Sequence, residues 1–162
     1  MIDAQIGHEK TLTAMLPALS GSNIIYGMGM LEMGMTMSYE QLLIDAEIVR
    51  MIRRIMQGIA VDSSTLALDV ITAVGPGGTY LGQRHTMQHM RKESSQTKLI
   101  DRSMYEGWVK SGEKDMAQRA HEEALQIIKN HKPEPLPEDV SKAIRSIIEE
   151  AEYEVGITNQ NR

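Results

Sequence analysis

One short apolar segment constrains the fold of this chain more than any other feature. Residues 23–27, with the sequence NIIYG, are apolar on both faces and bounded by glycines, which is typical of a strand buried in a parallel sheet. We find no other convincing strand among the 162 residues. A strand must pair its backbone N–H and C=O groups with a neighbour. Either this chain lends the strand to a partner, or the rest of the sheet lies outside this sequence.

Helical patterns cover most of the remaining sequence, so the predicted fold class is mainly α. Residues 2–19 predict a helix that Pro17 should kink or end early, because proline lacks a backbone donor. A second helix begins at Ser38, which forms a capping box with Gln41, and runs to about Gln57. Its apolar residues cover more than one narrow stripe, so we expect it to be packed on more than one side.

Three further helices are predicted. Asp62 or Ser63 caps the first, which continues to Val74 and is ended by glycine and proline. The second lies within residues 111–130, where alanines and isoleucines form one stripe. After a stiff, proline-rich connector, Pro137 is expected to be the first residue of the last helix.

Composition excludes several functional classes. The formal net charge is -5, so nothing favours binding to nucleic acid. No apolar run reaches the roughly 18 residues of a membrane-spanning helix, and no signal peptide is visible. The chain has no cysteine, which excludes disulfides and thiolate metal sites and is consistent with a cytoplasmic location.

A glycine-rich segment at residues 75–82 is the clearest candidate for a binding loop. It contains four glycines and a proline, which can continue neither a helix nor a central strand. Such a loop lets the backbone approach a ligand or another protein closely. We therefore place Gly77 and Gly78 in a candidate partner or loop site, together with His85 and His89 directly behind them.

The two histidines are four residues apart, which places both on one face of a helix, with Glu93 one turn further. Such a set could hold zinc or iron. The simpler interpretation, which we prefer, is that the imidazoles brace the glycine loop by hydrogen bonds. We therefore predict no metal site.

A methionine-rich stretch at residues 28–37 follows the predicted strand. Alternating thioethers can bind cuprous copper, form an adaptable apolar surface for a methyl-rich ligand, or fill a buried loop. The loop follows the carboxyl end of a strand, where α/β folds place their sites, so Tyr26 and Glu32 are the polar groups expected to face a ligand. A phenol ring and a carboxylate suit a quaternary ammonium ion.

Two other positions have competing interpretations. Trp108, with Tyr105 nearby, is interpreted as a packing anchor for the C-terminal helices rather than a binding cage. Lys10 could be a catalytic lysine, but we interpret it as a solvated residue at a helix end.

Several segments together resemble the carboxyl-terminal third of the trimethylamine methyltransferase family, which includes corrinoid-dependent enzymes for trimethylamine and for glycine betaine. The likeness spans nearly the whole chain in order. The segments that carry it are DAQIGHEK at residues 3–10, IIYGMGM at 24–30, YEQL at 39–42, LALDVI at 66–71 and GPGG at 75–78, followed by His85, Thr86, His89 and Arg91.

The resemblance implies a (β/α)8 TIM barrel that moves a methyl group from a methylated amine to the cobalt of a corrinoid protein. Residues 1–100 would form the last βα units of a truncated barrel and residues 101–162 a helical C-terminal extension. Tyr26, Met28, Met30 and Glu32 would line the substrate end. The glycine loop, with His85 and His89, would lie near it or face the corrinoid protein. This chain would bind no cofactor directly, because the partner carries the methylcobalamin or corrinoid.

The resemblance also implies that trimethylamine members use pyrrolysine, encoded by an amber codon just before the region aligning with Met1. We hypothesise that such a codon, read as a stop, explains where this chain begins; sequencing the DNA upstream tests this. The isolated chain is expected to be inactive. The alternative is a stand-alone, helix-rich interaction module that forms a homo-oligomer to cover its apolar surfaces and has no catalysis.

Overall fold

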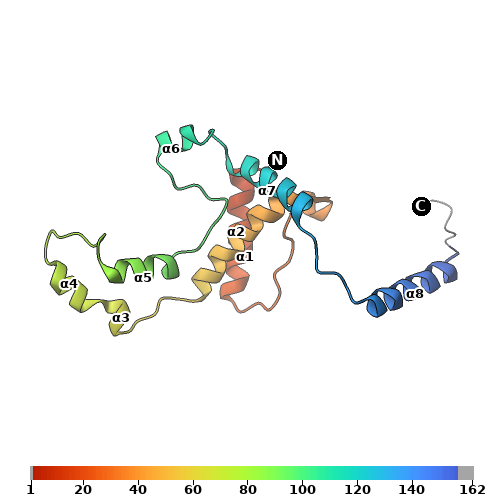
Figure 1. Ribbon diagram of the computed structural model, residues 1–162, viewed down its shortest axis with the longest axis horizontal. Helices are drawn as coiled ribbons and strands as arrows, with labels where there is room; N and C mark the ends of the chain where they lie inside the picture. Colours follow the sequence, from red (N-terminus) through yellow and green to blue (C-terminus); the bar gives the residue numbers. More distant parts are fainter. Residues whose placement is uncertain (1, 157–162) are drawn as a thin grey trace. The chain divides into compact units, whose positions relative to one another are not determined.

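The computed structural model describes residues 2–156. It divides into two units, and the boundary along the chain lies between Ile128 and Lys129. The predicted mainly α class is confirmed (Figure 1). In chain order the elements are α1 Ala4–Leu19, β1 Met30–Leu31, the 3-10 helix η1 Glu32–Gly34, β2 Thr36–Met37, α2 Tyr39–Met56, α3 Ser63–Leu66, α4 Leu68–Val74, α5 Arg84–Glu93, α6 Tyr105–Lys110, α7 Met116–Asn130 and α8 Glu138–Glu154. None of the helices between residues 2 and 156 has the length and apolarity that a membrane crossing requires.

The predicted strand at residues 23–27 is wrong for this chain, because the segment forms no regular secondary structure. The strands that form in the described part are β1 and β2, an antiparallel pair with Met30 opposite Met37 and Leu31 opposite Thr36. The physical reason is pairing: the methionine-rich segment folds back on itself, whereas residues 23–27 have no neighbouring strand within residues 2–156.

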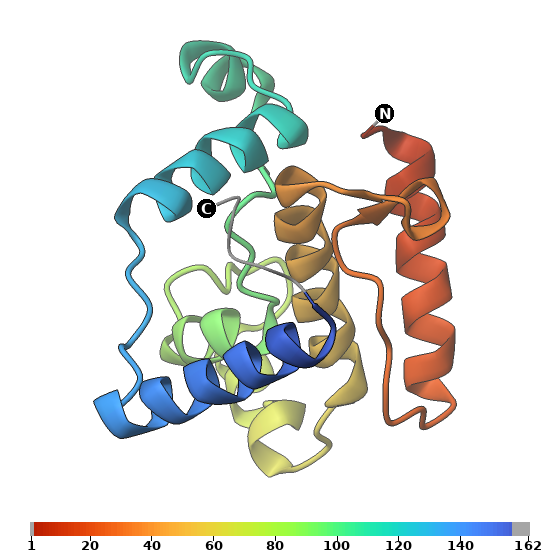
Figure 2. The same ribbon diagram turned by 90° about the vertical axis from the view of Figure 1, so that its right-hand side faces the viewer.

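Helix α1 confirms the first predicted helix. Asp3 caps it by accepting a hydrogen bond from the backbone N–H of Ile6 at 3.2 Å. Pro17 lies in the last turn, and the helix ends two residues later at Leu19. The proline is tolerated there because few backbone bonds remain to be lost. Helices α1 and α2 pack side by side (Figure 2).

Helix α2 has the predicted ends but only half of the predicted capping box. The Ser38 hydroxyl accepts the backbone N–H of Gln41 at 3.1 Å, as expected. The backbone N–H of Ser38 donates to the carbonyl of Gly29 at 2.9 Å instead of to Gln41. The side-chain amide of Gln41 is thereby free to turn into the protein, where it donates to Asp45 at 2.7 Å. The cap thus fastens the methionine-rich hairpin to the start of α2.

One small apolar cluster joins α2, α7 and the segment before α6. Its centre is formed by Ile44, Leu99 and Ala120, which are 6%, 7% and 0% exposed. Ala120 is the α7 residue of this cluster. The carboxylate of Glu47, 1% exposed, accepts the backbone N–H of Lys98 with both oxygens at 3.0 Å and so fixes the segment that carries Leu99.

The predicted helix from Asp62 to Val74 is in fact two helices, because Ala67 adopts a left-handed conformation with φ of 50° between α3 and α4. Asp62 caps α3 and forms a complete capping box with Thr65. The capping expectation is therefore confirmed, and the expectation of one continuous helix is wrong.

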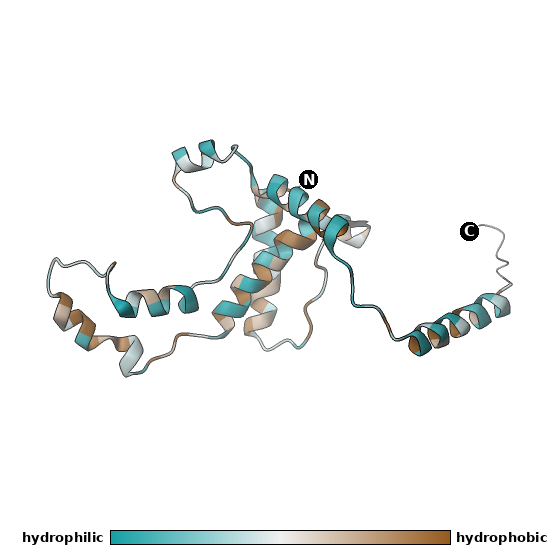
Figure 3. Ribbon diagram, viewed as in Figure 1, coloured by the Kyte–Doolittle hydropathy of each residue, from teal (hydrophilic) through white to brown (hydrophobic). Residues whose placement is uncertain are grey.

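The second unit contains α8. Pro137 occupies the position before the first helical residue, so the predicted start is displaced by one residue. The apolar residues of α8, which Figure 3 colours brown, are exposed. The division at Lys129 does not test the predicted boundary between residues 100 and 101, which stays a prediction.

Acid should weaken the link between α2 and α7. The pKa of Glu40 is lowered from 4.5 to about 2. The largest cause is the 2.8 Å hydrogen bond with His121 Nδ1, and the second is the hydrogen bond that the Ser38 hydroxyl donates. A depressed folded-state pKa stabilises the fold above the unfolded value, and this stability is lost as the pH falls from 4.5 towards 2. Because the side chains of Glu40 and His121 are both partly exposed, we expect their interaction to contribute about 1 kcal/mol to the free energy of unfolding.

The measurement is the difference in free energy of unfolding between the unmodified chain and Glu40→Gln, obtained by urea titration at about pH 6 and at about pH 2.5. We expect the difference to shrink at the lower pH. An equal difference at both pH values would contradict this assignment.

Candidate functional site

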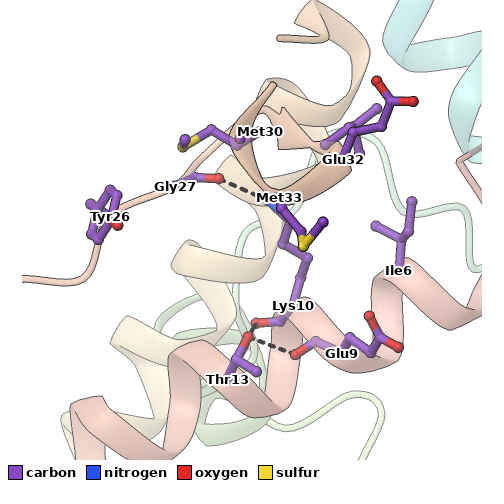
Figure 4. A pocket seen from close by; sticks show the side chains of 11 residues that line it. Ile6, Glu9, Lys10, Thr13, Tyr26, Gly27, Met30, Glu32 and Met33 are labelled. Atoms are coloured by element: carbon purple, nitrogen blue, oxygen red, sulfur yellow. Dashed lines mark hydrogen bonds between the residues drawn. The ribbon is translucent and has the colours of Figure 1, made fainter. Parts of the chain in front are cut away.

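An open hollow of about 490 Å³ lies between α1 and the segment that leads into the β1–β2 hairpin (Figure 4). The residues that give it chemical character are Glu9, Lys10, Tyr26, Met30, Glu32 and Met33. Two come from α1, and four come from residues 26–34, here called the hairpin segment. The hollow therefore joins residues that are distant in sequence and lie on two different elements.

The backbone of the hairpin segment is unusual where it borders this hollow. Glu32 and Met33 have positive φ angles of 49° and 52°, and Gly27, Gly29 and Gly34 also lie in the positive range. Positive φ is unfavourable for residues with a side chain and persists only when surrounding contacts enforce it. The conformation of Glu32 therefore depends on whatever anchors this segment.

Asp45 supplies that anchor. Its carboxylate is on α2, is 4% exposed, and accepts the backbone N–H of Gly29 at 2.8 Å. It also accepts Lys10 Nζ at 3.0 Å, while the same ammonium donates to the carbonyl of Gly27 at 2.8 Å. Figure 4 shows the bond from Lys10 to Gly27 at the wall of the hollow. The interpretation of Lys10 as a solvated helix end is thus wrong, because the lysine clamps the hairpin segment to α1 and α2.

The sequence interpretation missed Asp45 and the buried role of Gln41. The available signal was their position: both lie four residues apart on α2 among apolar residues, where a polar side chain needs a partner. Gln41 is 0% exposed, and its Oε1 atom has no hydrogen-bond partner among the described residues.

The charges around the hollow favour a cation. Lys10 is neutralised by Asp45, so the carboxylates of Glu9 and Glu32 leave the hollow with an excess of negative charge. Each carboxylate has one neutral partner: Glu9 accepts the Gln5 amide at 2.8 Å, and Glu32 accepts the Thr36 hydroxyl. An aromatic ring and two thioethers provide apolar, polarizable surface.

The structure brings together three of the four predicted substrate residues. Tyr26, Met30 and Glu32 all line the hollow, although Figure 4 shows Tyr26 and Glu32 at opposite sides of Met33. Met28 lines a second hollow of about 560 Å³, between the 22–28 segment and the α1–α2 pair.

The histidine pair braces a different element from the one we predicted. The rings of His85 and His89 stack with centroids 4.2 Å apart. His85 Nε2 lies 2.8 Å from the carbonyl of Ser64 and His89 Nε2 lies 3.5 Å from its hydroxyl, so both imidazoles contact α3 rather than the glycine loop. Glu93 forms an ion pair with Arg54.

The glycine loop is held by other contacts. The Thr86 hydroxyl donates to the carbonyl of Tyr80 at 2.7 Å. A Cβ atom on Gly78 would lie 2.5 Å from the carbonyl oxygen of Val74, so the close approach at this position requires glycine. Gly77, Gly78, His85 and His89 line neither of the two hollows.

Trp108 acts as a local packing residue. Its indole N–H donates to the carbonyl of Lys114 at 2.9 Å, and its ring contacts Tyr105 with centroids 5.9 Å apart. These contacts tie α6 to the turn that precedes α7.

Comparison with known proteins identifies clear relatives. A family model described as trimethylamine methyltransferase (MTTB) matches residues 1–156. A trimethylamine methyltransferase of Desulfitobacterium hafniense (strain DSM 10664 / DCB-2) is 53% identical over 155 residues, which are 96% of this chain and 31% of the relative. One from Methanosarcina thermophila is 47% identical over 144 residues, 89% of this chain and 30% of the relative. A glycine betaine methyltransferase of D. hafniense (strain Y51) is 37% identical over 156 residues, 96% of this chain and 32% of the relative.

Proposed function

The chain belongs to the trimethylamine methyltransferase family, and from that premise we propose that it is part of an enzyme that demethylates trimethylamine or a betaine-type quaternary amine. The methyl group would pass to the cobalt of a corrinoid carried by a partner protein. The observation that carries the proposal is 53% identity over 96% of the chain. The chain spans 31% of that relative's length, and the proposed activity is that of the whole enzyme.

The proposed fold of the whole enzyme is the (β/α)8 barrel, with the residues of this chain forming its C-terminal portion and a helical extension. The contact between helices α1 and α2 supports the proposal, because these helices flank the apolar segment at residues 23–27 in sequence, as helices flank a strand in a barrel of this kind.

The hollow beside α1 offers the chemistry that a methylated ammonium ion needs. A methyl group leaves nitrogen most easily when the nitrogen is positively charged, because the C–N bonding pair then stays on a neutral amine. The carboxylates of Glu9 and Glu32 would stabilise that positive charge, and the Tyr26 ring and the thioethers would contact the methyl groups.

The corrinoid would supply the metal that accepts the methyl group. Among residues 2–156, no three His, Cys, Asp or Glu side chains are grouped so that they could hold a metal ion. In this proposal the residues of this chain bind the amine.

The proposal is tested by reconstitution. This chain is co-produced with the part of the 53%-identical D. hafniense enzyme that lies outside the matched 155 residues, and is supplied with a reduced corrinoid protein. We expect dimethylamine from trimethylamine, or dimethylglycine from glycine betaine, only when all components are present. No demethylated amine from either substrate would refute the proposed function.

A matched pair of variants locates the substrate site. Glu32→Gln should raise KM at least about tenfold, which corresponds to the loss of one charge interaction of about 1.4 kcal/mol. Glu113→Gln is the control, because Glu113 also has a positive φ, of 56°, but does not line the hollow. An unchanged KM in Glu32→Gln would remove this residue from the site.

A further inference from the structure

An open hollow of about 420 Å³ lies where α6, the segment before it and the start of α7 meet. None of its lining residues lines the hollow beside α1, so its chemistry is separate from that of the proposed substrate site. The lining residues that give it chemical character are Asp101, Tyr105, Trp108, Lys114, Asp115 and Arg119.

Two aromatic rings line this hollow. The rings of Tyr105 and Trp108 lie with their centroids 5.9 Å apart and are tilted by 36°. The indole N–H donates to the carbonyl of Lys114 at 2.9 Å, which fixes the edge of the Trp108 ring in place. The face of an aromatic ring attracts cations, and that of tryptophan attracts them most strongly. The ring pair therefore favours a cationic ligand.

Two carboxylates line the same hollow, and each keeps an oxygen that has no hydrogen bond or ion pair within residues 2–156. Asp101 accepts the backbone N–H of Ser103 at 2.8 Å and the Ser103 hydroxyl, both with its Oδ1 atom. Asp115 accepts the backbone N–H of Gln118 at 2.8 Å, also with Oδ1. The Oδ2 atoms of both aspartates thus remain available to a ligand.

The two basic side chains at the hollow are engaged elsewhere. Lys114 Nζ forms an ion pair with Glu122 at 2.7 Å. The guanidinium group of Arg119 donates to the carbonyl of Leu99 at 2.9 Å and to the carbonyl of Lys114. Counting Glu122, three carboxylates are present with two cations, so negative charge is in excess. This excess also favours a positively charged ligand.

We propose that this hollow binds a small organic cation of the quaternary-ammonium type. The rings of Tyr105 and Trp108 contact its methyl groups. The Oδ2 atoms of Asp101 and Asp115 balance its positive charge. A metal ion is a poorer fit, because it needs several closely grouped ligands and residues 2–156 contain no such group of three His, Cys, Asp or Glu side chains.

The single tryptophan of the chain gives this site a signal of its own. We expect tetramethylammonium chloride, titrated at constant ionic strength, to change the fluorescence of Trp108 saturably, with half-saturation at about 1–10 mM. tert-Butanol has a similar shape without the charge and should give no saturable change. The proposal is overturned if tetramethylammonium changes neither the fluorescence nor the indole N–H resonance saturably, or if tert-butanol gives an equal response.

A matched pair of substitutions tests the aromatic contact. Tyr105→Leu should weaken tetramethylammonium binding at least about threefold, because it removes one ring face. Tyr153→Leu is the control, since Tyr153 lies on α8, does not line the hollow, and should leave the affinity within about 1.5-fold. The two side chains are 74% and 87% exposed, so both variants should keep the helix content of the chain. Equal affinities in the two variants would contradict the proposal.

A further variant separates this hollow from the one beside α1. Glu32→Gln should leave the Trp108 titration within about 1.5-fold, because Glu32 does not line this hollow. Weakening as large as that in Tyr105→Leu would mean that the fluorescence reports the other hollow, and would remove the site proposed here. The titration requires no methyl transfer, so its result is independent of whether the reconstituted enzyme demethylates an amine.

Discussion

Replacing Asp45 with asparagine is expected to lower the free energy of unfolding by about 2–4 kcal/mol. The carboxylate accepts hydrogen bonds from three donors: Lys10 Nζ, the backbone N–H of Gly29 and the Gln41 amide. An asparagine has one accepting oxygen, so its own NH2 group would face a donor. The substitution would also leave the Lys10 ammonium, whose side chain is 26% exposed, without its counter-charge.

The free energy is measured by urea unfolding followed by circular dichroism, with Asp69→Asn as the control. Asp69 is exposed on α4, and its replacement should change the free energy by less than about 0.5 kcal/mol. Lys10→Met should recover part of the loss when combined with Asp45→Asn, because it removes the unpaired charge. Equal effects of the Asp45 and Asp69 substitutions would show that the anchor contributes nothing to stability.

The hairpin segment should respond to the same substitution. Without the Asp45 anchor, the bonds that hold Gly29 and indirectly Gly27 are lost, and the left-handed conformation of Glu32 loses its support. We therefore expect faster amide exchange at residues 27–34 in Asp45→Asn than in the Asp69→Asn control.

Ile44→Ala is the second large effect that we expect, a loss of about 2–4 kcal/mol in the free energy of unfolding. Ile44 is 6% exposed and contacts Leu99 and Ala120, in a cluster that joins three parts of the first unit. Its truncation would leave a cavity that these neighbours, held by Glu47 and by α7, cannot close fully.

Ile59→Ala is the matched control, because Ile59 is 88% exposed and its truncation removes the same atoms without creating a cavity. Chemical denaturation of both variants under identical conditions gives the comparison. A loss below about 0.5 kcal/mol in Ile44→Ala would mean that the cluster is not the core.

The helices could be predicted closely because their signals are local. Ser38 and Asp62 cap helices through hydrogen bonds to residues two or three positions away. Helix α2 ends just before Gly58, as predicted. The break at Ala67 could not be predicted, because alanine favours a helix and nothing nearby in the sequence opposes one.

The candidate site could be predicted only in part. Tyr26, Met30 and Glu32 are close in sequence and follow a strand-like segment, which was enough to group them. The glycine loop was recognised as a shaped loop, but the sequence pattern did not show that the stacked imidazoles contact Ser64, which is 21 and 25 residues away.

The sequence by itself determined the helical class, the main helix ends and the family, because capping, periodicity and identity are carried by neighbouring residues. Only the tertiary structure decided that Lys10 pairs with Asp45, 35 positions away, and that Glu47 holds Lys98, 51 positions away. Such pairs depend on which helix faces pack together, and a local pattern does not contain that information. The same holds for residues 23–27, whose sequence favours a strand but whose pairing needs a partner in space.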